Sequence, residues 1–368
     1  MKVLTLLILA STILALASCS KNKDDDRGGN GDFPKISAGL NSIFFIDAER
    51  SLWASGRNSE GQLGDGTNIS KLVPVRVERN VISVASGNTH TLFVKSDNSL
   101  WVCGANTYGE LGDGTRLAHT EPIWIMDGVA QVAAGANVSV ILKTDGTVWT
   151  TGRNLYSALG DGTYADRTTP VRILENVKKV TAKGTITFFL KNDNTLWVSG
   201  VSVVRLGGGP PRPVVPIQVA EDVATMECGP SHVLFVKNDH TLWAFGNNLD
   251  GAWGIPTPTH SVEELPIKIM DNVLKAAAGD SYTLMIKTDN SLWGTGLNRY
   301  GELGLGFPGL TRVATRIMEG VREVAANRNI SIIIKSDGTI MTAGLNDQGQ
   351  LGDGTLYTRA SFVPVRNQ

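Results

Sequence analysis

One short pattern returns seven times along this chain and limits what it can fold into. In each copy an aromatic residue, replaced once by methionine, follows an aliphatic one, and a glycine stands three residues later. The intervals between successive copies are 48, 48, 48, 46, 50 and 48 residues. The copies are marked by Trp53, Trp101, Trp149, Trp197, Trp243, Trp293 and Met341, and by Gly56, Gly104, Gly152, Gly200, Gly246, Gly296 and Gly344. A repeat of this length predicts a series of similar structural units in place of two unrelated domains.

Within one unit, residues 73–115, four short apolar segments alternate with turn residues. These segments are residues 74–77, 81–87, 89–95 and 99–104. The last two are joined by Ser96-Asp97-Asn98, and Asp followed by Gly, Asn or His recurs at that place in later units. Asp-Gly and Asp-Asn pairs tolerate the positive φ that a tight β-hairpin requires. Each unit is therefore predicted to be a four-stranded antiparallel sheet.

A sheet with two apolar faces must stack against neighbours, and radial stacking produces a β-propeller. The recurring tryptophans are expected to pack between adjacent blades. Residues 36–39 match the end of a second strand, and residues 362–366 match a first strand. These ends predict that the C-terminal strand completes the N-terminal blade and closes the ring. The expected fold is all-β, a seven-bladed propeller of four-stranded antiparallel blades spanning residues 36–368.

The loop pattern Gly104-x-Asn106-x-x-Gly109-x-Leu111-Gly112-Asp-Gly-Thr115, with Val84-Ala-Ser-Gly87-x-x-His90 before it, resembles the RCC1 repeat. RCC1 stands for regulator of chromosome condensation. The resemblance extends over all seven copies and implies the propeller fold. In the family namesake it also implies nucleotide exchange on a small GTPase through an inserted wedge. Spacings of 46 to 50 residues leave no room for that wedge, so exchange activity is the least expected function.

The first 35 residues are predicted to direct and tether the protein. Residues 1–18 combine Lys2 with an apolar run shorter than the ~20 residues of a membrane-spanning helix, as in a secretory signal peptide. Leu16-Ala-Ser-Cys19 resembles the lipobox of bacterial lipoproteins, which implies cleavage before Cys19 and lipidation of its sulfur. Residues 19–35 are polar and glycine-rich, as in a flexible tether.

The tether also carries a lysine followed by acidic residues shortly after Cys19. This resembles the surface-export signal of Bacteroidetes lipoproteins. The resemblance implies an outer-membrane protein that faces the cell exterior, and a periplasm-facing lipoprotein is the alternative.

Charge and motifs argue against several classes of site. With 34 basic and 35 acidic residues and no basic run, the chain lacks the footprint of a nucleic-acid binder. The loop aspartates lack the alternating ligands and the late Glu of an EF-hand, so we expect them to hold turns. They are Asp65, Asp113, Asp161 and Asp353. Cys103 and Cys228 are expected to be separate buried thiols. No metal or cofactor site is predicted.

Aromatic residues recur in the long loops, which we expect to lie between blades. Tyr108, Tyr156 and Tyr300 share one loop position, and Trp253 lies in the matching loop of the fifth unit. Strand order places these loops on the same face as the turns that hold His90 and His232. Aromatic side chains exposed on one face are typical of protein or sugar binding. Alternatively, these aromatic side chains pack the loops onto the blades.

The function predicted from these features is a monomeric, lipid-anchored scaffold that binds a protein or glycan and has no catalytic residues. The atypical loops, residues 201–213 and 249–264, would set its specificity. A propeller enzyme acting on glycans, as a lyase or hydrolase, is the alternative. That alternative requires two carboxylates within reach of each other on one face.

Overall fold

A computed structural model describes residues 35–200, 215–255 and 262–366, and this part of the chain is almost entirely β-structure. Its strands form seven four-stranded sheets, each with purely antiparallel pairing. One short 3-10 turn, η1 (Leu155–Ser157), interrupts a loop of the third sheet. Among the described residues, no helix has the length and apolar character needed to cross a membrane.

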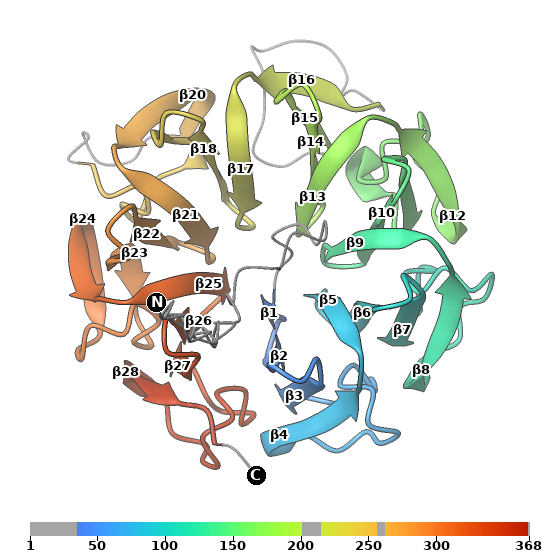
Figure 1. The fold of residues 1–368 in the computed structure, drawn as a ribbon, viewed down its shortest axis with the longest axis horizontal. Coiled ribbons are helices and arrows are strands. Elements are labelled where there is room, and N and C mark those ends of the chain that lie inside the picture. Colours follow the sequence, from blue (N-terminus) through green and yellow to red (C-terminus); the bar gives the residue numbers. More distant parts are fainter. Residues whose placement is uncertain (1–34, 201–214, 256–261, 367–368) are drawn as a thin grey trace, which may run out of the picture. The chain divides into compact units, whose positions relative to one another are not determined.

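The sheets are arranged in a ring as seven blades (Figure 1). The first blade contains β1 (Ile36–Ala38), β2 (Ser42–Ile46), β3 (Leu52–Gly56) and β4 (Lys71–Glu78). The second contains β5 (Val81–Ser86), β6 (His90–Lys95), β7 (Leu100–Gly104) and β8 (His119–Met126). The third contains β9 (Val129–Ala134), β10 (Val138–Lys143), β11 (Val148–Gly152) and β12 (Arg167–Leu174). The fourth and fifth contain β13 (Val177–Lys183), β14 (Ile186–Lys191), β15 (Leu196–Ser199) and β16 (Ile217–Ala220); and β17 (Val223–Cys228), β18 (His232–Lys237), β19 (Leu242–Asn247) and β20 (Val262–Met270). The last two contain β21 (Val273–Ala278), β22 (Tyr282–Lys287), β23 (Leu292–Asn298) and β24 (Gly309–Met318); and β25 (Val321–Asn327), β26 (Ile330–Lys335), β27 (Ile340–Gly344) and β28 (Arg359–Pro364).

Each blade begins with a strand at the central axis and ends with a strand at the rim (Figure 1). The four strands of a blade follow one another in the sequence, so every blade is one continuous stretch of chain. This arrangement confirms the predicted seven blades of four antiparallel strands.

The predicted closure of the ring is wrong. β28 pairs with β27 of the last blade, with Met341 opposite Pro364, and β1 pairs with β2 of the first blade. The error lies in where the unit was divided. Residues 74–77, which the sequence analysis took as a first strand, form part of β4, the outermost strand of the preceding blade. β1 is therefore a complete innermost strand, and β28 is the outermost strand of its own blade.

The ring closes by packing between its first and last blades. Ile36 and Phe45 of the first blade share a buried apolar cluster with Ile332 and Leu351 of the last. Hydrogen bonds reinforce this seam from Asn327 Nδ2 to the backbone oxygen of Ala38 and from Gly354 N to the backbone oxygen of Leu72, both at 3.0 Å. Stacking of apolar faces therefore holds this junction, as it does the other blade interfaces.

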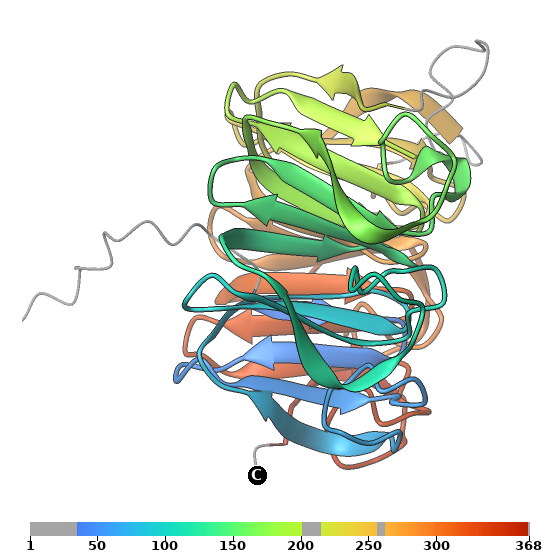
Figure 2. The same cartoon turned by 90° about the vertical axis from the view of Figure 1, so that its right-hand side faces the viewer.

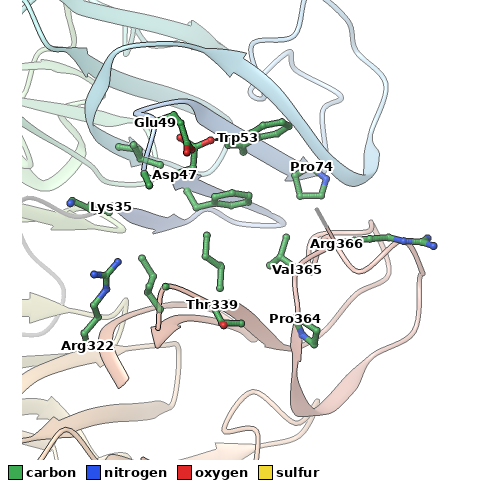
Figure 3. A pocket seen from close by; sticks show the side chains of 16 residues that line it. Lys35, Asp47, Glu49, Trp53, Pro74, Arg322, Thr339, Pro364, Val365 and Arg366 are labelled. Carbon is green, nitrogen blue, oxygen red and sulfur yellow. Dashed lines mark hydrogen bonds between the residues drawn. The ribbon is translucent and has the colours of Figure 1, made fainter. Parts of the chain in front are cut away.

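A groove of about 730 Å³ runs along the seam (Figure 3). Lys35, Asp47 and Trp53 line it from the first blade, and Arg322 and Val365 line it from the last. Asp47 has a structural role, because its carboxylate accepts hydrogen bonds from Ser51 N and Trp53 Nε1, both at 2.7 Å.

The recurring tryptophans lie between adjacent blades, as predicted. Trp101 packs against a cluster that includes Phe44 of the first blade and Phe93 of the second. Its indole nitrogen donates to Ser99 Oγ at 2.9 Å, and the Lys95 ammonium lies 4.2 Å from the ring centroid. The other members occupy the corresponding interfaces: Trp53, Trp149, Trp197, Trp243, Trp293 and Met341.

Gly104 shows why glycine recurs at the end of the third strand. Its φ is +103°, and a Cβ atom there would lie 2.4 Å from the backbone oxygen of Thr89. The repeat therefore requires both left-handed backbone and close approach, which only glycine provides. The equivalent glycines also have positive φ: Gly56, Gly152, Gly200, Gly246, Gly296 and Gly344.

Candidate binding face

The long loop between the third and fourth strands of each blade projects from one face of the ring, which we call the loop face. In the second blade this loop covers residues 105–118. His90, at the start of β6, pairs with Gly104 at the end of β7, so the turns between first and second strands open on the same face. The opposite face, the hairpin face, carries turns such as Ser96-Asp97-Asn98. Figure 2 shows the ring edge-on with its strands running between the two faces.

The long loops belong to single blades and do not connect two blades, which corrects the sequence-based expectation. Each nevertheless leans on its neighbour. The backbone oxygen of Gln62, in the loop of the first blade, accepts a 2.8 Å hydrogen bond from Thr91 Oγ1 of the second. Similarly, Gly109 O accepts from Thr151 Oγ1 of the third blade at 2.9 Å.

A buried asparagine and the predicted turn-holding aspartate lock each regular loop. In the second blade, Asn106 Nδ2 donates to Asp113 Oδ1 at 2.9 Å, and Asn106 Oδ1 accepts from Leu111 N at 3.0 Å. Asp113 Oδ1 also accepts from Thr115 N at 2.8 Å. The same pairing occurs at Asn58 and Asp65, Asn154 and Asp161, and Asn346 and Asp353. The prediction that these aspartates hold turns is confirmed.

A basic residue at the start of the outer strand adds to each lock. Arg167 Nη2 lies 2.7 Å from Asp161 Oδ2, and Arg359 Nε lies 2.6 Å from Asp353 Oδ2. Burial alone would raise the pKa of Asp161, but hydrogen bonds from Thr163 and Arg167 hold that pKa below its ordinary value. Hydrogen bonds thus hold the central aspartate of each of these loops in place. No group of three or more potential metal ligands occurs among the described residues.

Three of the six candidate binding residues are buried. Trp253, His90 and His232 each have an exposed fraction of 0%, so the prediction that they lie on a surface is wrong. Trp253 occupies the core position that leucine holds in the Leu-Gly pair of other loops, for example Leu111, and packs between the fifth and sixth blades.

The two buried histidines join neighbouring blades. His90 Nε2 is hydrogen-bonded to Ser139 Oγ at 3.1 Å, and His232 Nε2 to Thr283 Oγ1 at 2.9 Å. Burial lowers the pKa of each histidine to about 4, so both are neutral at pH 7. Their role is structural.

The three tyrosines divide. Tyr156 is exposed by 39%, whereas Tyr108 and Tyr300 are half-buried. The guanidinium of Arg153, from the third blade, lies 4.6 Å from the Tyr108 ring centroid. At Tyr300 the nearby guanidinium belongs to Arg299 of the same loop, 5.5 Å from the ring centroid. For Tyr108, the structure supports the alternative reading that the ring packs its loop onto the next blade.

The most exposed apolar side chains of the loop face were missed by the sequence analysis. They lie at the tips of the long loops of five blades, and we call them the loop-tip patch: Ile69 (66% exposed), Leu117 (69%), Tyr164 (59%), Phe307 (57%), Leu356 (54%) and Tyr357 (72%). In four of these loops they come one or two residues after the Leu-Gly-Asp-Gly-Thr run. This position in the sequence could have identified these residues. The polar groups of the loop are already paired with one another, so the loop has no core in which a further apolar side chain can be buried.

The backbone beneath the loop-tip patch is fixed by the loop threonines. Thr115 Oγ1 accepts from Leu117 N at 3.1 Å, and Thr355 Oγ1 accepts from Tyr357 N at 3.2 Å. These tips are thus held before any partner arrives. Residues 201–214 and 256–261 lie outside the described part of the chain, and so does Cys19 with the rest of residues 1–34. The predicted specificity loops and the lipidation site thus remain predictions.

Both remaining cysteines are buried and free, as predicted. Cys103 lies in β7 and Cys228 at the end of β17, and burial raises the pKa of each thiol to about 12. Neither thiol is poised to react.

Comparisons with known proteins point to one family of repeats. A family model described as the regulator of chromosome condensation (RCC1) repeat matches residues 51–94 and 97–142. A second model of the same description matches residues 81–110 and 129–157. Comparison with curated proteins returned no match.

Several solved structures share the fold. Prp20p from Saccharomyces cerevisiae, described with its binding properties to Gsp1p and histones, is 20% identical with a TM-score of 0.78 over 88% of this chain and 88% of its own. Human WBSCR16 is 19% identical with a TM-score of 0.76 over 86% of this chain and 93% of its own. The CRINKLY WD40 ectodomain of the Arabidopsis thaliana receptor kinase ACR4 is 14% identical, with a TM-score of 0.54 over 90% and 98%. At this identity the likeness establishes the fold.

Proposed function

Since this chain is an RCC1-like seven-bladed propeller, a fold that generally supports a binding role, we propose that it captures a partner protein through its loop face. The observation that carries the proposal is the loop-tip patch. Single exposed apolar residues are ordinary, but five loops here repeat the feature on one face. Protein interfaces combine such apolar contacts with a polar rim.

The chemistry of the patch favours a protein over a glycan. Tyr164, Phe307 and Tyr357 have rings that suit a protein or a sugar, but Ile69, Leu117 and Leu356 are aliphatic and have no ring on which a sugar can stack. They suit the apolar side chains of a partner protein. The hydrogen bonds within each loop reduce the entropy lost on binding, because the tips need not be ordered at that moment.

Membrane anchoring through Cys19 is the second part of the proposal. The chain enters the ring at Lys35, which lies on the hairpin face next to the turn that contains Asp47. A lipid on Cys19 would hold the ring at the membrane through this connection. With the tether of residues 19–35, this fits an exported lipoprotein at the outer membrane.

The proposed role is binding without catalysis. Asp280, Glu110 and Glu302 are three loop-face carboxyls whose pKa burial raises, as a glycan-cleaving enzyme would need. However, Glu302 is one of four equivalent residues that perform the same task. Gln62 and Gln350, which carry no charge, accept a backbone hydrogen bond at that position just as Glu302 does. Its function is to hold a turn.

The test is capture by the full-length lipoprotein from cells that export it, followed by covalent cross-linking. A Leu117→Ser/Tyr357→Ser double variant should lose the cross-linked partner. The control is Trp124→Ser, which removes an exposed apolar side chain (53%) from the outer strand β8. Capture that survives the double variant unchanged would place the interface elsewhere.

Anchoring is tested separately by labelling cells with a fatty-acid analogue. The wild-type chain should carry the label and Cys19→Ala should not. Protease added to intact cells should degrade an outward-facing propeller, and its protection would mean that the propeller faces the periplasm.

A further inference from the structure

The turns between first and second strands meet around the central axis and form a hydrogen-bonded collar on the loop face. Asn88 N donates to Ala136 O at 3.2 Å, and Ala136 N donates to Gly184 O at 2.7 Å. On the other side, Asp280 N donates to Arg328 O at 3.3 Å. Each bond joins one blade to the next, so the collar fixes the shape of the channel mouth.

The collar changes character at the fifth blade. Pro230 has no N–H to donate, and Ser231 Oγ makes the bond to Asp280 O instead. The chain then places a carboxylate, Asp280, and a guanidinium, Arg328, at the collar positions of the last two blades. The equivalent residues of the second to fourth blades are Asn88, Ala136 and Gly184, all uncharged.

A cavity of about 480 Å³ lies inside the collar. Lys183, Asp280 and Arg328 line it together with small residues such as Gly135 and Ser281. This volume is within the ~300–1,000 Å³ range of small-molecule sites in proteins. The channel mouth is therefore large enough for a compact ligand.

Lys183 is itself an exception in the repeat, since glycine stands at the equivalent position in the second, third, fifth and sixth blades. Its ammonium donates to the backbone oxygen of Ala38, across the ring, at 3.2 Å. Asn327 donates to the same oxygen. The lysine thus adds a positive charge to the cavity wall.

The carboxylate of Asp280 lacks a hydrogen-bond donor among the described residues of this cavity. Its Oδ1 atom is buried and accepts no hydrogen bond within the described part of the chain. Arg328 and Lys183 lie near enough to act electrostatically on Asp280, but neither donates a hydrogen bond to its Oδ1 atom. A buried charged acceptor without a donor is costly, and a ligand that supplies a donor would relieve that cost.

We propose that the channel mouth binds an α-amino carboxylate, either a free amino acid or the C-terminal residue of a peptide. The nitrogen of the ligand donates to Asp280 Oδ1, and its carboxylate lies toward Arg328 and Lys183. With one negative and two positive groups on the cavity wall, a simple amine is repelled and a simple anion leaves Asp280 unsatisfied. A molecule that carries both groups satisfies the site, and acidic and neutral amino acids should bind better than lysine or arginine.

The experiment measures the thermal stability of the full chain, then calorimetric binding, with each of the common L-amino acids at millimolar concentration. A parallel arm uses N-acetylated tripeptides with a free or an amidated C-terminus. Binding of free amino acids alone identifies a metabolite site, and binding of the free-carboxylate peptides identifies a chain-end site. In both arms a ligand with an amidated carboxyl should fail to bind.

Asp280→Asn and Arg328→Gln should each weaken binding at least tenfold. Their controls, Asp271→Asn and Arg322→Gln, alter exposed charges outside the cavity and should leave binding unchanged. Asp280→Asn should fold with undiminished stability, because its Oδ1 has no partner to lose. Absence of binding by every amino acid and peptide, or equal binding in Asp280→Asn, would overturn the proposal. The Leu117→Ser/Tyr357→Ser variant should bind normally, which separates this site from the proposed protein interface.

Discussion

The Oε2 atom of Glu302 accepts a 2.7 Å hydrogen bond from the backbone nitrogen of Tyr300, so a carboxyl holds the turn of the sixth long loop. Glu302 is only 1% exposed, and burial raises its pKa to about 7. Its pKa in the folded protein is therefore above the ordinary value of 4.5. Its contribution to stability is complete below pH 4.5 and is lost as the pH rises through 7.

Glu302→Gln should consequently stabilise the protein at pH 8 by about 1–3 kcal/mol and have no stabilising effect at pH 4. Glutamine makes the same hydrogen bond without the buried charge, as Gln62 and Gln350 already show. Urea unfolding at the two pH values measures the difference. The exposed Glu49→Gln serves as the control and should change little at either pH. A gain that does not depend on pH would contradict this account.

Asp161→Ala should destabilise the protein by about 2–3 kcal/mol, because several hydrogen bonds to one partly buried carboxylate are lost together. The partners are Thr163 N, Asn154 Nδ2 and Arg167. Since hydrogen bonds hold the pKa of Asp161 below 3.8, this stabilisation is present above that pH and is lost as the pH falls below it. Thermal unfolding at pH 7 and pH 3 tests both statements. Asp127→Ala removes an exposed carboxylate bound to Trp124 Nε1 and should cost much less.

Gly104→Ala and Gly338→Ala separate two reasons why a position requires glycine: a positive φ and the lack of space for a Cβ atom. Both residues have positive φ, +103° and +89°. A Cβ at Gly104 would strike Thr89 O, whereas nothing lies within 4 Å of a Cβ at Gly338. We expect ~1 kcal/mol of destabilisation at Gly338, from backbone strain alone, and a several-fold greater loss at Gly104. Equal losses in denaturant titration would mean that the clash relaxes freely.

A circular permutant tests how the ring closes. Lys35 and Arg366 line the same groove at the seam, so a flexible linker of about ten Gly and Ser residues, with a reach near 18 Å, can join Arg366 to Lys35. New ends between Arg79 and Asn80, between the first two blades, leave all seven sheets intact. This permutant should melt within a few degrees of the wild type. A permutant opened at Asp97, inside the second blade, should melt far lower, and similar melting of the two would refute closure by packing.

The blades could be predicted from the sequence because residues such as Trp101 and Gly104 meet requirements that every copy shares. Trp101 fills the interface between two blades, and Gly104 takes the left-handed backbone conformation at the end of the third strand. The way in which the ring closes could not be predicted, because a repeat of 48 residues does not show at which strand each blade begins. Only three residues separate residues 74–77 from Val81, and nothing local shows whether that short link stays within a sheet or passes between sheets.

The candidate site was harder to predict for a similar reason. Trp253 looked exposed because loops usually are, but its place in the Leu-Gly position put it in the core. The channel mouth depends on Asp280 and Arg328, which come from different blades, 48 residues apart. Only the arrangement around the axis brings such residues together.

Because each blade is one uninterrupted stretch of chain, duplicating or deleting the corresponding stretch of the gene would add or remove a whole sheet and break none. A ring whose last strand completes its first blade lacks this freedom, since any change in copy number must preserve the split blade. In this chain only the curvature would have to adjust, through the packing angle at each interface. The architecture thus allows the number of blades to change by one whole blade at a time.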